Sequence, residues 1–191
     1  MLRRKLKGFL ASALLIAKPL ATIKKMNSSI KDLWNEFKSG LLSSSLLNNS
    51  IKIKNEFLPI ELTELLTLNN GQNLYEDGIF KLIRNSAITN KWNKYKFLED
   101  VKIIEILNKI STSQEIKYSE EIPFAISDEF ENGNVCLTIN KNDKKISVVT
   151  FGFKPENYDL REISSYVQDK NVISKDIVEF IKVQIMFNEM E

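Results

Sequence analysis

Hydrophobic residues after position 27 recur at the spacing of one helical face. They are Ile30, Leu33, Trp34, Phe37 and Leu41. Residues spaced by three, four, seven and eleven positions from the first face the same side of a helix. Polar residues 27–29 can cap the first turn, and Gly40 favours fraying near the end. We therefore predict a helix from about residue 30, with Trp34 in the core.

A second short helix is predicted to start at a proline. Pro59 suits the first helical position because its ring fixes φ near the helical value. Leu62, Leu65 and Leu66 form the inner face of this helix. The Asn-Asn-Gly run at 69–71 ends it, since Gly and Asn tolerate the left-handed conformation found at helix ends.

The pattern of hydrophobic and polar residues between positions 79 and 110 indicates both a strand and a helix. Residues 79–83 are predicted to form a strand, whereas the segment 86–110 is predicted to be helical. Glu99 and Asp100 favour a helix start near Val101, because acidic side chains complement the positive end of the helix dipole. Apolar side chains then recur at helical spacing, at Ile103, Ile106, Leu107 and Ile110.

Beyond the polar segment at 111–121, the spacing of apolar residues changes from the helical period to a period of two. Residues 122–126 are a predicted strand, and apolar positions alternate with polar ones along 135–139. The segment 146–151 can pair back onto that strand as a hairpin. Cys136, which lies on this alternating strand, is expected to be a small buried packing residue.

The C-terminal segment predicts a last helix, with Ser174 as its cap. Its apolar residues form two stripes, Ile177, Phe180 and Ile181 in one, and Val183, Met186, Phe187 and Met190 in the other. Two stripes indicate burial on more than one side or a partner there, and they permit a homodimer. Helices, then strands, then a helix predict an α+β domain with an antiparallel sheet.

Residues 1–26 form a basic, apolar leader in front of a single domain predicted at 27–191. The uncharged apolar stretch 8–17 is about half as long as a membrane span requires. Three interpretations stay open. The leader is a secretory signal, an amphipathic helix that brings residues 1–25 onto anionic lipid, or an upstream start-codon artefact before a natural start at Met26.

Charge is divided unevenly along the chain. Residues 1–25 contain seven of the 27 Lys and Arg residues and no acidic residue, which leaves 20 basic and 25 acidic residues afterwards, a net charge of −5. A domain of this sign gains little from neutralising phosphates, so no nucleic-acid partner is predicted. A basic protein is the better partner, because opposite potentials steer the encounter.

The residue content limits the chemistry. The chain has no histidine and one cysteine, which excludes Ser-His and Cys-His nucleophiles and any intramolecular disulfide. A zinc site would need almost only carboxylate ligands. We predict no catalytic, cofactor-binding or metal site. The free thiol fits a reducing compartment, and the expected location is the cytoplasm, with membrane association through the leader as the alternative.

Two surface features are candidates for binding a partner. One is an acidic run that contains a single basic residue, Lys117, among Glu115, Glu120, Glu121, Asp128, Glu129 and Glu131. It either docks a basic partner or is solvated surface with no partner. The other is Trp92, which is flanked by polar and basic residues and is either an exposed anchor or a core residue.

Two motifs carry a resemblance to a known family. Leu58-Pro59 opens a helix that ends in Asn70-Gly71-Gln72, and Ile122-Pro123-Phe124-Ala125 precedes Gly133 and the strand at 135–139. In order and separation they resemble the SUKH superfamily over roughly residues 29–187. The resemblance also places Trp92 on a helix. Asn140 stands where the family often has an acidic residue at the end of that strand.

The resemblance implies a curved antiparallel sheet flanked by helices and no catalytic activity. Bacterial members of the SUKH superfamily commonly act as toxin-immunity proteins, and other members regulate fungal cell-wall synthesis. We therefore expect a non-catalytic protein that binds and neutralises a cognate protein toxin. The alternatives are a regulatory scaffold of the same family with no toxin partner, and a peripheral membrane protein tethered by residues 1–25.

Overall fold

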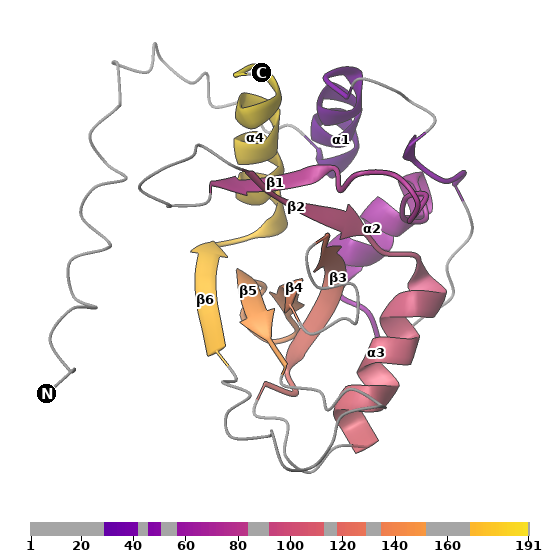
Figure 1. The fold of residues 1–191 in the computed structure, drawn as a ribbon, viewed down its shortest axis with the longest axis vertical. Helices are drawn as coiled ribbons and strands as arrows, with labels where there is room; N and C mark the ends of the chain where they lie inside the picture. The colour runs from indigo at the N-terminus through magenta and orange to yellow at the C-terminus, as the bar shows by residue number, and fades with distance from the viewer. Residues whose placement is uncertain are drawn as a thin grey trace, which may run out of the picture.

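A six-stranded antiparallel sheet and four helices make up an α+β fold (Figure 1). The computed structural model describes residues 29–41, 46–50, 57–83, 92–112, 118–128, 135–151 and 169–190. The helices are α1 (Ile30–Ser39), α2 (Ile60–Leu68), α3 (Asp100–Thr112) and α4 (Ile177–Asn188). The strands are β1 (Phe80–Ile83), β2 (Trp92–Phe97), β3 (Glu121–Ser127), β4 (Val135–Asn140), β5 (Ile146–Thr150) and β6 (Asp169–Ser174). The leader at 1–26 lies outside the described residues.

The strands follow one another across the sheet in the order of the sequence, β1 to β6. Every neighbouring pair is antiparallel, including the predicted hairpin of β4 and β5. Register shifts between Pro123 and Ala125 and between Ile146 and Ser147 bend the strands, as bulges do. The sheet therefore curls into a half-barrel (Figure 1), which confirms the predicted curved antiparallel sheet flanked by helices.

Phe80 on β1 occupies the centre of an aromatic core. Its ring centroid lies between 5.3 and 6.2 Å from those of five other buried rings, Trp34, Phe37, Phe97, Phe124 and Phe180. Most of these pairs are tilted or edge-to-face, the arrangements that aromatic quadrupoles favour. The rings come from α1, β2, β3 and α4, so one cluster joins both halves of the chain. The prediction that Trp34 belongs to the core is confirmed.

The first two helices begin close to their predicted positions. Ser29 caps α1, where its hydroxyl accepts a hydrogen bond from the Asp32 N–H at 3.2 Å. Pro59 is the N-cap of α2 and not its first helical residue, so that helix begins at Ile60. Gly71, beyond its end, has the positive φ expected of the Asn-Asn-Gly run, at 75°.

The prediction of a helix over 86–110 is wrong at residues 92–97, and residues 86–91 lie outside the described residues. Residues 92–97 form β2, which pairs with β1 and β3, and the described helix begins at Asp100. Trp92 therefore begins a strand and does not lie on a helix. Along β2, Asn93, Tyr95 and Phe97 share one face, a period of two that the helical spacing further along obscured.

The C-terminal helix starts two residues later than predicted. The sequence pattern also did not predict the strand β6 that precedes it. Asp176 is the N-cap of α4, where its side chain accepts the Glu179 N–H at 2.7 Å, whereas Ser174 is the last residue of β6. Most side chains of β6 are exposed or half-buried. The strand thus lacks the alternation of apolar and polar residues that identifies a half-buried strand from sequence.

Candidate functional site

The described residues of the predicted acidic run, Glu120, Glu121 and Asp128, are not gathered into one surface. Glu120 and Glu121 stand at the start of β3 and Asp128 just after its end. A strand rises about 3.3 Å per residue, which puts roughly 25 Å between the two groups. Glu115, Glu129 and Glu131 lie outside the described residues.

Glu121 is buried, so the prediction that it belongs to an exposed surface is wrong. Its side chain is only 1% exposed. The carboxylate accepts hydrogen bonds from the Thr138 hydroxyl at 2.5 Å and the Asn140 amide at 2.7 Å, and it pairs with the Lys170 ammonium. A buried charge requires partners of this kind. Glu121 therefore joins β3, β4 and β6 and has a structural role.

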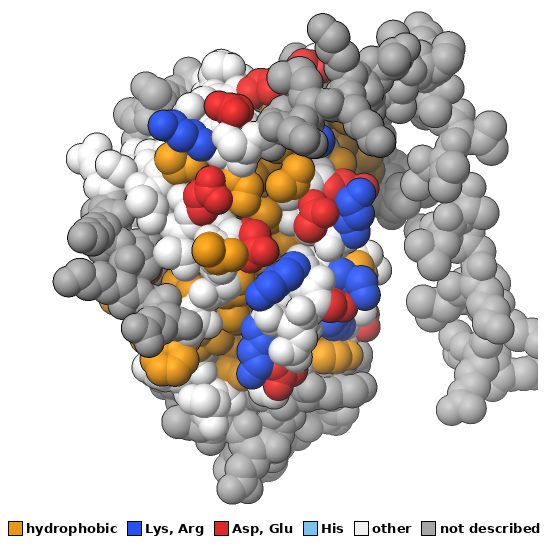
Figure 2. Space-filling model, turned by 180° about the vertical axis from the view of Figure 1, so that it is seen from behind, with side chains coloured by type: hydrophobic (Ala, Val, Ile, Leu, Met, Phe, Trp, Pro, Cys, Tyr) orange, Lys and Arg blue, Asp and Glu red, His pale blue; other side chains and the backbone are white. Residues whose placement is uncertain are grey.

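The other two described carboxylates of the run are also engaged within the chain. Asp128 accepts the Gly78 N–H at 2.9 Å, and its other oxygen lies 3.9 Å from the Lys96 ammonium. Glu120 pairs with Lys141 at 2.8 Å on half-exposed surface. Figure 2 shows acidic and basic side chains interleaved on the face that it presents. The described acidic residues thus do not form a docking surface of one sign.

The Asn-Asn-Gly-Gln run at 69–72 holds separate elements together. Asn69 accepts the indole N–H of Trp34 on α1 at 3.0 Å. Asn70 accepts the Asp100 N–H, also at 3.0 Å, and donates its amide to the Asp100 carboxylate at 3.0 Å. Because Asp100 is the first residue of α3, these two bonds fix where that helix begins.

Gln72 and Gly71 complete the same junction. The buried Gln72 side chain accepts the main-chain N–H groups of Ile79 and Phe97, at 3.2 and 2.8 Å. A Cβ on Gly71 would lie 2.5 Å from the main-chain nitrogen of Glu99, so only glycine fits. The Asn-Gly-Gln part of the resemblance is therefore used by the fold, because the side chains of Asn70 and Gln72 bond within the chain.

Trp92 belongs to an exposed apolar surface, which we call the apolar patch. Its members are Ile83, Trp92, Met186, Phe187 and Met190. Ile83 pairs with Trp92 across β1 and β2, and the Trp92 and Phe187 ring centroids are 4.8 Å apart. Ile83, Met186 and Met190 are 61%, 46% and 70% exposed. The second stripe predicted on the last helix is thus the half that the core does not cover, since Ile177, Phe180 and Ile181 are buried.

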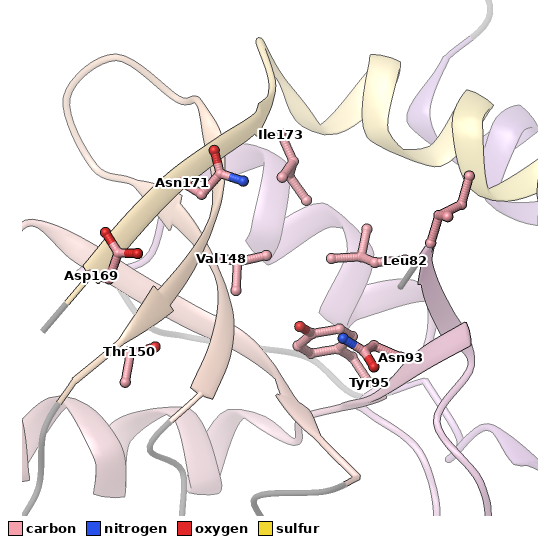
Figure 3. Close-up of a pocket in the computed structure, with 9 residues that line it drawn as sticks. Leu82, Asn93, Tyr95, Val148, Thr150, Asp169, Asn171 and Ile173 are labelled. Carbon is pink, nitrogen blue, oxygen red and sulfur yellow. The ribbon is translucent and has the colours of Figure 1, made fainter. Parts of the chain in front are cut away.

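A hollow lies on the concave face of the curled sheet, next to the apolar patch. Its volume is about 340 Å³. Side chains of β1 and β2 face those of β5 and β6 across it, with Leu82 and Tyr95 directed toward Val148 (Figure 3). The described lining residues are Leu82, Ile83, Asn93, Tyr95, Val148, Thr150, Asp169, Asn171 and Ile173. Because Ile83 belongs to both surfaces, the hollow and the apolar patch are continuous.

The described residues offer little for chemistry. No group of three or more His, Cys, Asp or Glu side chains that could hold a metal ion occurs among them. Cys136 is buried, as predicted, and burial raises the pKa of its thiol far above the usual value. The thiol is therefore protonated at neutral pH and a poor nucleophile.

Within the ranges that the structure describes, no helix is both long and apolar enough to cross a membrane.

No protein-family model matches the chain, and no curated protein or solved structure is significantly similar to it. The resemblance to the SUKH superfamily therefore stays a prediction from the sequence.

Proposed function

We propose that this chain is a non-catalytic protein of the immunity type, which binds a cognate protein toxin and neutralises it by covering the toxin's site. The apolar patch is the observation that carries the proposal. It combines a contacting Trp–Phe pair with two exposed methionines. Tryptophan is enriched at binding hot spots, and methionine adapts to the shape of a partner.

The patch is also held in place before any partner binds. Trp92 begins a strand inside the sheet, and the methionines stand on a helix whose other face is buried. The backbone that carries these side chains is therefore already ordered and loses little freedom on association, which favours affinity. A partner that covers this surface would remove several large apolar groups from water at once.

The choice of a toxin as the partner rests on the sequence. The SUKH resemblance supplies the immunity role, and the net charge of −5 over residues 26–191 favours a basic partner through electrostatic steering. Neutralisation by binding needs no nucleophile. It therefore agrees with a chain that has no histidine and a single, buried cysteine.

The test is co-expression with a toxin-bearing gene that neighbours this one, scored by cell survival and co-purification. The double variant Met186→Glu with Met190→Glu places charge on the patch at exposed positions that the fold tolerates. We expect it to lose protection and to weaken toxin binding at least about tenfold, the loss typical of a hot spot. Tyr75→Glu is the control, since Tyr75 is 99% exposed and lies outside the patch.

Four results would count against this proposal. Full protection by the double variant removes the patch from the interface. Failure of the native chain to protect against the neighbouring toxin removes the immunity role, and absence of any toxin-bearing neighbour favours the regulatory scaffold. A native dimer that the double variant converts to monomer, measured by light scattering, assigns the patch to a second copy of the chain.

A further inference from the structure

The lining of the hollow on the concave face is unusual in its charge. Among the described lining residues, Asp169 is the one that carries a charge, and the remaining polar groups are the amides of Asn93 and Asn171 and the hydroxyls of Tyr95 and Thr150. None of these described residues is a lysine or an arginine. The described lining therefore combines a negative charge with neutral polar groups and no compensating cation.

Among the described residues, Asp169 has no lysine partner, although a lysine follows it directly in the chain. Its neighbour Lys170 pairs with Glu121 instead. The one hydrogen bond that Asp169 makes is to the main-chain N–H of Lys170, at 2.8 Å. By contrast, Asp77 and Asp143 each contact a lysine ammonium, at 2.6 and 2.8 Å. A partner's cation could thus approach Asp169 without displacing one from this chain.

An amide oxygen of another lining residue has no hydrogen-bond partner among the described residues. Asn93 Oδ1 is buried and makes no hydrogen bond with any described residue. An unsatisfied buried acceptor raises the free energy of the unbound state, and a donor from outside would relieve that cost. Asn93 stands on β2 and Asp169 on β6, so polar side chains line the hollow from both sides (Figure 3).

The apolar part of the lining suits the stem of a long side chain. Leu82, Val148 and Ile173 form walls of the hollow, whereas Thr150 and Asp169 are paired further along β5 and β6. Lysine and arginine lay their methylene stems on apolar surface while the charged head reaches polar groups. At about 340 Å³ the hollow is near the small end of ligand pockets, which span roughly 300–1,000 Å³. It has room for one such side chain.

We propose that the hollow is the pocket for a basic side chain, arginine or lysine, of the protein that binds the apolar patch. This inference rests on the proposed function, because it names the anchor of the same partner. The stem lies along Leu82 and Val148, and the cationic head faces Asp169 and the amide oxygens. Ile83 joins the two surfaces, so one partner can fill the hollow and cover the patch together.

The probe for this test is N-acetyl-arginine amide, titrated into the full chain and followed by the backbone amide signals in NMR spectra. We expect saturable shifts at residues of β2, β5 and β6 that line the hollow, with millimolar affinity. N-acetyl-norleucine amide has a similar stem without charge, and N-acetyl-glutamate amide has the opposite charge. Both should bind at least about threefold more weakly, the contribution of an exposed ion pair.

The matched variants are Asp169→Asn and Asp143→Asn. Each removes one carboxylate from exposed surface, but Asp143 lies in the turn between β4 and β5, outside the hollow. We expect Asp169→Asn to weaken binding of the arginine probe at least about threefold and Asp143→Asn to leave it unchanged. The inference is overturned by shifts outside the hollow, by no saturable shift, by equal affinity for norleucine, or by equal losses in both variants.

The result of the probe titration can be distinguished from the result of the toxin-protection test of the proposed function. If the arginine probe fails while the double methionine variant loses protection against the toxin, the pocket is wrong and the immunity role stands. If the probe binds as expected and the native chain gives no protection, the immunity role is wrong and the pocket remains.

Discussion

At the scale of single residues, the main chain of Leu98 and Glu99 lies so close to Gly71 that a side chain does not fit at this position. Gly71 has a φ of 75°, and a Cβ would meet the main chain of Leu98 and Glu99 at 2.5 to 2.9 Å. Gly71→Ala therefore adds left-handed strain to a clash with backbone, and we expect it to lower the free energy of unfolding by about 2–4 kcal/mol. Denaturant unfolding measures this difference.

Gly40→Ala is the control for that substitution. Gly40 has a φ of −86°, and the nearest atoms to an added Cβ belong to the Asn188 side chain, at 3.2 Å. A side chain can move where a backbone cannot, so the change should stay within about 1 kcal/mol. Equal losses at the two glycines would contradict the assigned role of Gly71.

The ion pair of Glu121 and Lys170 should respond unequally to loss of either partner. Lys170→Met leaves a carboxylate that is 1% exposed without its cation, whereas Glu121→Gln leaves an ammonium that is 24% exposed and can reach water. Breaking a fully buried pair costs about 3–5 kcal/mol, so we expect Lys170→Met to approach the lower end and Glu121→Gln to cost less. A double-mutant cycle of unfolding free energies checks both the order and the coupling. Equal costs with no coupling would show that the pair does not act as a unit.

At the scale of elements, the start of α4 predicts a dependence of stability on pH. Hydrogen bonds from the Lys175 N–H and the Ser174 hydroxyl, with the nearby Lys175 charge, lower the pKa of Glu179. A lowered folded pKa means that this stabilisation is present above the usual carboxyl pKa and is lost as the pH falls through the folded one. Because Glu179 is 45% exposed, solvent screening keeps the effect below about 1 kcal/mol.

Glu179→Gln tests this assignment. The native chain should be the more stable of the two at pH 7, and the difference should vanish in acid once Glu179 is protonated. Unfolding curves at a series of pH values measure it. A difference that persists unchanged in acid would mean that the carboxylate charge is not what stabilises the start of α4.

The edge of the sheet at β1 is closed by a side chain and not by another strand. Gln184 on α4 accepts the Lys81 main-chain N–H at 2.7 Å and donates to its carbonyl at 3.1 Å. Gln184→Leu removes both of these hydrogen bonds and should destabilise the fold by about 1–3 kcal/mol. Hydrogen exchange should then accelerate at the Lys81 amide more than at amides of the central strand β4. Uniform acceleration would instead indicate general destabilisation.

At the scale of the whole molecule, one aromatic core makes the described elements depend on each other. Phe80→Ala removes the ring that contacts aromatic residues from α1, β2, β3 and α4. We expect a loss of about 3–5 kcal/mol and a single unfolding transition that is the same by circular dichroism and by tryptophan fluorescence. Separate transitions would show that the helices and the sheet unfold as independent units.

The amino-acid sequence alone determined the helices near residues 30, 60 and 101 and the hairpin of β4 and β5, because their apolar residues repeat at the period of the element. Only the tertiary structure decided β2, β6 and the surface. Strands with polar or exposed residues are recognised by their neighbours in the sheet. For the candidate site, the burial of Glu121 and Trp92 likewise could not be predicted from the sequence. Whether a carboxylate is buried beside a lysine, or an indole lies half-buried against Phe187, depends on residues far away in the chain.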